Sequence, residues 1–274
     1  DETGTLNVLV RSQSNGDAMF LSEHTQGAMA LVRVPERLFG AGVATVSSSR
    51  YRMLPRPDGY SVQNRFVGPW LLYGAGRGYV TDHKGEGQLY AVRYASKDEP
   101  TQIRLDQGIE RIEPMADDAV VVGSRGQDLV FTPVALEKEA HARRDFVRKD
   151  AAQGEMRSHG FFYKPSSGKA REGFVGLPIR SPGAAHGRSY LLEGSASVLF
   201  LAHKDLELSS VGSLAASPLA TNHDGCRASC VDWYGNARPI FLGGRVFALL
   251  VYELVEGRLS GSGPREQIEE RRRV

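Results

Sequence analysis

The sequence predicts an all-β protein that is built from a repeated strand–turn–strand unit. Two copies are plain: Trp70–Gly76 followed by Gln88–Arg93, and Ala119–Gly126 followed by Asp128–Val134. In each copy an apolar run ends in a glycine-containing turn, and a second strand-like run follows. Units of roughly 40 to 50 residues that contain only strands are typical of β-propeller blades. At about 45 residues per blade, the chain is expected to form a propeller of about six or seven blades as a single domain over residues 1–274.

Strand signals continue along the whole chain. Some runs alternate apolar and polar residues, and others are almost continuously apolar, as expected of strands buried on both faces. The further predicted strands are Leu6–Val10, Ala28–Val34, Arg65–Tyr73, Leu89–Tyr94, His159–Tyr163, Gly173–Ile179, Val198–Ala202 and Phe247–Tyr252. The best helical candidate, Val134–Ala142, can equally end a strand and begin a charged hairpin loop.

The clearest hairpin lies near the end of the chain. Two apolar runs, Pro239–Leu242 and Arg245–Leu250, are joined by Gly243 and Gly244. A primed two-residue turn needs positive φ angles, which glycine adopts without steric cost. The sequence therefore predicts a tight hairpin turn at the two glycines.

Closure of the ring is a further expectation. A propeller leaves a bare sheet edge unless its first and last blades pair. We therefore expect the Leu6–Val10 strand in or beside the blade formed by Phe247–Leu259. If the ring needs more blades, a missing N-terminal segment or another chain would complete it. The chain starts at Asp1 rather than Met, which favours a processed protein or the C-terminal part of a longer polypeptide.

Charge and hydropathy exclude some classes of function. A net charge of +2 is too close to neutral to suggest a nucleic-acid partner. No apolar run approaches the roughly 18 residues of a membrane-spanning helix. The only dense basic cluster, Arg271–Arg273, is expected to be the solvated end of a strand, with a docking tail as the alternative.

The two cysteines, Cys226 and Cys230, are close in sequence. In an exported protein this spacing favours a disulfide across a short loop. Free thiols are one alternative, and a metal site that includes His223 and Asp224 is another. Closed zinc sites usually take four ligands from Cys-x-x-Cys pairs, so no cofactor is predicted, and a structural divalent metal ion is left open.

Three regions resemble bacterial secreted proteins that carry a C-terminal β-propeller. The matching stretches are Gln63–Gly74, Arg157–Pro165, and Trp233–Leu242 together with Phe247–Gly257. The resemblance rests on packing residues and would cover most of the chain. It implies the propeller fold and an exported location, whether periplasmic, cell-surface or extracellular. It implies no activity, because propellers host many unrelated functions.

Catalytic motifs are weak throughout. The segment Gly194–Val198 lacks the last glycine of a Gly-x-Ser-x-Gly nucleophile elbow. Asp117, Asp118 and Asp145 could supply a carboxylate pair for glycoside hydrolysis, although two acids before an apolar strand are also a common polar lead-in.

Histidines in turns could meet at one end of the propeller channel and bind a metal. His24, His83, His203 and His223 stand beside or near acidic residues, and ordinary solvated loop residues are the simpler interpretation. His159 precedes an aromatic run and is expected to be a hydrogen-bonded core histidine.

The sequence therefore favours a non-catalytic exported propeller. It would bind a protein or a polysaccharide, or act as a scaffold in an envelope or extracellular assembly. The alternative is a hydrolase or a metal-dependent enzyme with its site at the mouth of the channel. A cluster of His, Asp and Glu would favour the enzyme, whereas exposed aromatics such as Trp70 or Tyr234 would favour binding. No catalytic or binding residue is assigned.

Overall fold

The computed structural model describes residues 1–12, 27–39, 42, 45–58, 61–76, 87–169, 171–180, 196–216, 237–250, 253–261 and 266–274. The chain divides into two compact units. Unit 1 is Asp1–Ile112 with Leu136–His141, and unit 2 is Glu113–Ala135 with Ala142–Val274. In the described ranges, no helix is long and apolar enough to cross a membrane.

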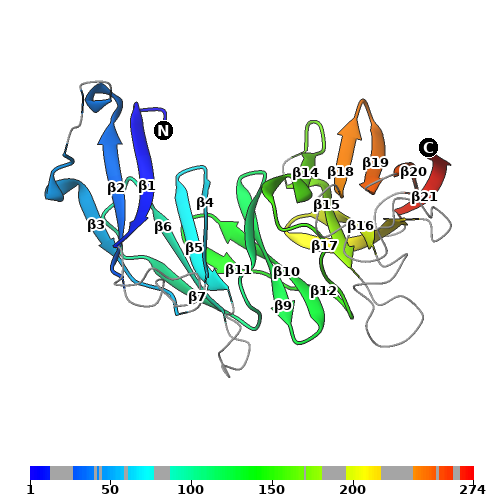
Figure 1. Cartoon of the computed structure of the whole chain (residues 1–274), viewed down its shortest axis with the longest axis horizontal. Coiled ribbons are helices and arrows are strands. Elements are labelled where there is room, and N and C mark those ends of the chain that lie inside the picture. The colour runs from blue at the N-terminus through cyan, green and yellow to red at the C-terminus, as the bar shows by residue number, and fades with distance from the viewer. Residues whose placement is uncertain are drawn as a thin grey trace, which may run out of the picture. The chain divides into compact units, whose positions relative to one another are not determined.

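Five antiparallel sheets follow one another along the described chain (Figure 1). The first has the order β1-β2-β3, with β1 (Thr5–Arg11), β2 (Met29–Pro35) and β3 (Tyr51–Leu54). The second has the order β4-β5-β6-β7, with β4 (Ser61–Val67), β5 (Trp70–Gly76), β6 (Gly87–Arg93) and β7 (Thr101–Leu105).

The other three sheets complete the series. The third, β11-β10-β9-β8 with β12 also on β10, comprises β8 (Arg111–Met115), β9 (Asp118–Arg125), β10 (Asp128–Leu136), β11 (Ala140–Ala142) and β12 (Phe146–Arg148). The fourth, β13-β15-β16-β17 with β14 also on β15, comprises β13 (Ala152–Gln153), β14 (Phe162–Pro165), β15 (Glu172–Arg180), β16 (Ala196–Lys204) and β17 (Glu207–Ala215). The last, β18-β19-β20-β21, comprises β18 (Arg238–Leu242), β19 (Arg245–Leu250), β20 (Glu253–Ser260) and β21 (Gln267–Arg273).

The all-β prediction is confirmed. The helical turns of the described residues are three short 3₁₀ turns, η2 (Glu36–Leu38), η3 (Ser48–Arg50) and η4 (Ser158–Gly160). The Val134–Ala142 stretch ends β10 and continues into β11 rather than forming an α-helix. In the described chain β1 pairs with β2, and β20 pairs with β19 and β21. Closure of a ring by pairing of the first strand with the last blade stays a prediction.

The predicted Gly243–Gly244 turn is confirmed. Leu242 lies opposite Arg245 in the β18–β19 ladder, so the two glycines are the whole loop. Their φ angles are +54° and +81°. These are the left-handed values that a primed hairpin turn requires and that side chains disfavour.

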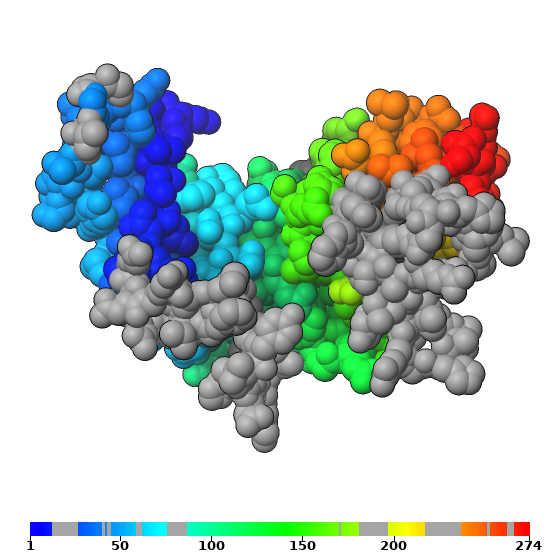
Figure 2. Space-filling model, viewed as in Figure 1, coloured from blue at the N-terminus to red at the C-terminus, as the bar shows by residue number. Residues whose placement is uncertain are grey.

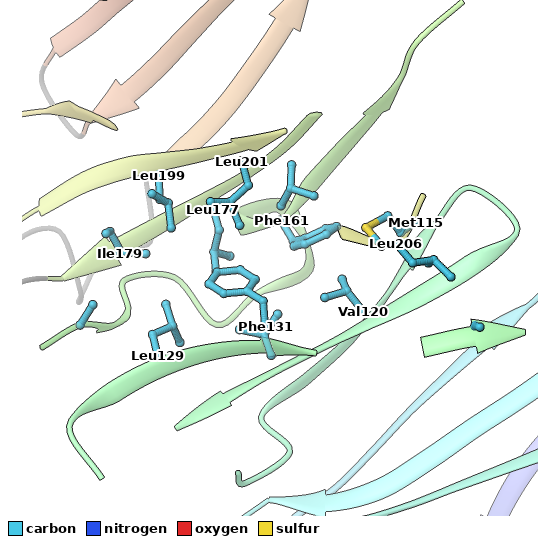
Figure 3. Packing of buried hydrophobic residues seen from close by; sticks show 14 residues of the cluster. Met115, Val120, Leu129, Phe131, Phe161, Leu177, Ile179, Leu199, Leu201 and Leu206 are labelled. Carbon is cyan, nitrogen blue, oxygen red and sulfur yellow. The ribbon is translucent and has the colours of Figure 1, made fainter. Parts of the chain in front are cut away.

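A large core in unit 2 lies between the third and fourth sheets. Leu129 and Phe131 on β10 are directed toward Leu177 and Ile179 on β15 (Figure 3). Phe131 and Leu177 are both 0% exposed. Full burial of side chains of this size is worth about 1.5–3 kcal/mol each, so this cluster fixes the position of the fourth sheet.

The last sheet packs through a second core of unit 2, and it runs from orange to red in Figure 2. Ile268 on β21 fits against Gly257, where an added Cβ would come within 2.6 Å of its Cδ1 atom. Arg271 binds Glu256 at 3.0 Å and Arg273 binds Glu253 at 2.7 Å. The basic Arg271–Arg273 cluster is therefore the end of a paired strand, as predicted.

Candidate active site

An interrupted edge strand forms the local framework of the site. β13 and β14 both pair with β15: Ala152 lies opposite Arg180, and Phe162 lies opposite Gly176. Gly154 still donates its N–H to the Pro178 carbonyl at 2.9 Å, and residues 155–161 then leave the ladder. Interruptions of this kind at sheet edges often re-aim side chains beside functional sites. Here the interruption carries Glu155, Arg157 and His159.

Glu155 places a carboxylate in the protein interior. Its side chain is 4% exposed. The Arg157 backbone N–H donates to Oε1 at 2.8 Å, and the Arg157 Nε atom is 3.6 Å from the same oxygen. The Oε2 atom is 3.4 Å from Nε2 of His159. A buried carboxylate is costly unless donors and cations surround it. This short segment supplies both at Oε1, whereas Oε2 accepts no hydrogen bond in the described part of the chain.

The 3₁₀ turn η4 brings His159 back toward Glu155, four residues earlier. The Gly160 N–H donates to the Arg157 carbonyl at 3.0 Å and closes the turn. A Cβ at Gly160 would lie 2.8 Å from both the Cγ and the carbonyl oxygen of Glu155, so the close approach requires glycine. Phe161, only 7% exposed, anchors the end of the turn in the core.

The prediction that His159 is a core histidine is wrong. Its side chain is 37% exposed, because the strand begins at Phe162 and the histidine lies in the turn before it. The imidazole thus reaches solvent while its carboxylate partner is buried. A carboxylate beside an accessible imidazole is the arrangement that general-base catalysis uses, where a hydrogen bond between the two orients the ring. Here the two side chains are within ion-pair distance, and Glu155 Oε2 accepts no hydrogen bond from the described residues.

His203 on β16 lies in a second polar cluster, but it is closed to substrates. The residue is 2% exposed. Its Nδ1 atom is 3.0 Å from the Tyr163 hydroxyl, and its Nε2 atom accepts the Leu206 N–H at 3.2 Å. The Tyr163 hydroxyl donates to the Glu172 carbonyl at 3.1 Å. This pattern defines a neutral ring with the proton on Nδ1, and burial lowers the pKa of His203 accordingly.

Of the three carboxylates proposed for glycoside hydrolysis, Asp117 is exposed, and the other two bind separate arginines. Asp118 receives Arg171 through two hydrogen bonds of 2.8 and 3.3 Å. Asp145 accepts from Thr132 at 2.7 Å and from Arg125 at 3.2 Å. Each carboxylate is neutralised by its own cation, which leaves the pair without the acid and base roles that the reaction needs.

The remaining predicted candidates, together with His141 and His186, are of three kinds. His24, His83, His186, His223, Asp224, Cys226, Cys230 and Tyr234 lie outside the described residues. His141 is exposed, with its Nδ1 atom 3.3 Å from the Glu139 carbonyl oxygen. Trp70 is 5% exposed beneath the Arg93 guanidinium, so it provides no aromatic binding surface. Within the described ranges, no group of three or more His, Cys, Asp or Glu residues is placed to hold a metal ion.

Comparison with known proteins gives distant structural similarity only. No family model matches the chain, and no curated protein matches it. A solved structure from Bacteroides uniformis, provisionally assigned as a 6-phosphogluconolactonase, is 10% identical with a TM-score of 0.33, and the match covers 97% of this chain and 82% of that one. A protein of the same provisional assignment from Bacteroides fragilis is 10% identical with a TM-score of 0.32, over 99% and 82% of the two chains.

The provisional assignments of these two proteins differ from the expected function. Both are assigned as enzymes, which contradicts the non-catalytic binding or scaffold module and agrees better with the alternative, a hydrolase. With TM-scores of 0.33 and 0.32, the similarity assigns no substrate and no residue to this chain. A site must come from the chain's own geometry.

Proposed function

We propose that this protein is a hydrolase in which His159 is the general base and Glu155 holds it in position. The observation that carries the proposal is the pairing of a 4% exposed carboxylate with a 37% exposed imidazole at 3.4 Å. Glu155 was not among the residues that the sequence analysis singled out. The Glu-x-x-x-His-Gly spacing is the signal that could have found it.

The chemistry follows from the arrangement. His159 accepts a proton from a water molecule as the water oxygen attacks an electrophilic carbon or phosphorus. The buried Glu155 carboxylate stabilises the imidazolium that forms. The imidazolium then returns the proton to the leaving oxygen, which restores the neutral ring. The Arg157 guanidinium, whose side chain is 58% exposed, offsets the cost of burying the carboxylate in the resting state.

A substrate panel tests the proposal. Purified protein is assayed with chromogenic carboxylic esters, phosphate esters and glycosides. We expect turnover of at least one class, and a loss of about 10²- to 10⁴-fold in kcat for His159→Ala, as is typical of a lost general base. Glu155→Gln should also lower kcat and alter its pH profile, because the neutral amide stabilises an imidazolium poorly.

His141→Ala is the matched control, since it removes an exposed histidine outside the interrupted strand. It should keep wild-type kcat. Absence of turnover in all three classes, or full activity in His159→Ala with an unchanged melting temperature, contradicts the proposal.

We also propose that the five sheets are successive blades of a β-propeller of six or seven blades, completed by a further segment or another chain. The support is their order: each sheet is antiparallel and is built from strands that are consecutive in sequence, as in propeller blades. Light scattering of the purified chain distinguishes a ring completed by a further segment from a ring completed by another chain. A monomer favours a further segment of the same chain, and a stable oligomer favours a second copy.

An exported location is a further proposal, supported by the resemblance to secreted proteins and by the spacing of Cys226 and Cys230. A disulfide between them closes a short loop and contributes at most about 3 kcal/mol. We expect the mass of the native protein after alkylation without reductant to show no modified thiol. Two alkylated thiols would show that the bond is absent, and a zinc adduct in native mass spectrometry would support a metal site instead.

A further inference from the structure

The hairpin turn between β16 and β17 has an unusual backbone. Lys204 pairs with Glu207, so Asp205 and Leu206 form the whole loop. Both residues have positive φ angles, +49° and +64°. Primed turns of this shape normally use Asn and Gly, and a branched side chain such as leucine is a rare and strained occupant.

Three contacts hold this strained turn closed. The Leu206 N–H donates to His203 Nε2 at 3.2 Å. The Asp205 N–H donates to the Arg171 carbonyl at 2.9 Å. The Leu206 side chain is 2% exposed and belongs to the core shown in Figure 3. Of the three, only the bond to His203 depends on a group that can take up a proton near neutral pH.

The surroundings of His203 favour its neutral form. Titratable and charged groups on several elements face it: Tyr163 on β14, Arg171 just before β15, Glu172 at its start, Asp118 on β9 and Asp205 in the turn. Burial is the largest influence and lowers the pKa of the imidazole. Asp118, Asp205 and Glu172 oppose that shift, and Arg171 adds to it.

We propose that His203 makes the β16–β17 turn sensitive to acid. Protonation of Nε2 removes the acceptor of the Leu206 N–H and places a second donor against it. The strained turn then opens, and Leu206 leaves the core. The fold thus contains a conformational switch that is separate from the proposed Glu155–His159 site.

The direction of the pH dependence follows from linkage. Because the folded pKa of His203 is below the ordinary value of 6.5, the opened turn binds the proton more readily than the closed turn. The stabilising contribution is complete above pH 6.5 and is lost as the pH falls toward the folded pKa. Over that interval the opening equilibrium rises by up to tenfold per pH unit.

Amide hydrogen exchange tests the switch. The protection factor of the Leu206 N–H, corrected for intrinsic exchange, is measured between pH 7.5 and pH 4.5. We expect it to fall by up to tenfold per pH unit below pH 6.5 in the wild-type protein and in the control His141→Gln. In His203→Gln the amide oxygen can still accept the bond but does not titrate, so the protection factor should stay constant.

Equal acid loss in His203→Gln, or constant protection in the wild-type protein, overturns the proposal. If His203→Gln fails to fold, a second measurement on the wild-type protein alone still tests the proposal. The imidazole ¹⁵N shifts of His203 should report an unprotonated Nε2 at pH 7.5 and a midpoint below 6.5. A proton on Nε2 at pH 7.5, or a midpoint above 6.5, overturns the proposal as well.

Discussion

Gly160 shows how one residue sets the geometry of the proposed site. It is the last residue of η4, directly before Phe161, and it packs onto the Glu155 side chain and carbonyl. A larger residue cannot be accommodated by a side-chain rotation alone, because one of the two close atoms belongs to the backbone. The position of the carboxylate beneath His159 therefore depends on the absence of a side chain at position 160.

Gly160→Ala should displace the Glu155–His159 pair. Overpacking of this kind costs about 1–3 kcal/mol in stability. We expect a modest fall in melting temperature and a larger proportional fall in kcat, measured on the substrate that the panel identifies. A variant with wild-type kcat would mean that the pair tolerates the shift or does not act in catalysis.

Asp118 and Asp145, the two arginine-bound carboxylates, differ in burial, and this difference predicts how much each contributes to stability. The side chain of Asp118 is 1% exposed and that of Asp145 is 29% exposed. Asp118→Ala removes two hydrogen bonds to a charged group, each worth about 1.5–3 kcal/mol, and leaves Arg171, whose 36% exposed side chain can reach water. Exposed pairs are worth about 1 kcal/mol or less. Asp118→Ala should therefore lower the urea midpoint much more than Asp145→Ala. The reverse order would contradict the assigned burial.

At the scale of elements, strands and tight turns are the features that the sequence predicts well. Apolar runs such as Ala119–Val122 and the Gly243–Gly244 turn carry their signal locally, in periodicity and in glycine. The site does not. His159 precedes three aromatic residues and so resembles a strand position, but the ladder breaks before Phe162. The partners of His203 could not be predicted from the sequence either, because Tyr163 lies 40 residues away along the chain.

The β18–β19 hairpin offers a direct test of turn chemistry. Replacing Gly243 and Gly244 together by Val forces positive φ on branched residues, at about 1–3 kcal/mol each. Nothing lies within 4 Å of a Cβ at either position, so the loss would come from the backbone. Replacement of both by Asn, which tolerates positive φ, should cost much less in thermal melts. Equal melting temperatures for the two variants would contradict this explanation.

At the scale of the molecule, repeated antiparallel sheets provide a rigid support for a site at an interrupted strand. The Glu155–His159 pair lies next to the fourth sheet, and that sheet is fixed by the large core around Phe131 and Leu177. Sequence repeats predict this architecture because the same strand–turn–strand unit recurs in the second and third sheets. They do not predict the interruption, which departs from the pattern and carries the proposed chemistry.

Chemical rescue is the most direct test of the proposed general base. His159→Ala is assayed on the substrate from the panel, with increasing concentrations of free imidazole. We predict that imidazole restores a measurable part of the lost kcat, that the restored rate increases with its unprotonated fraction, and that imidazole leaves the wild-type rate unchanged. A variant that is folded and inactive at every imidazole concentration, or one as active as the wild-type protein without imidazole, would contradict the assignment of His159 as the base.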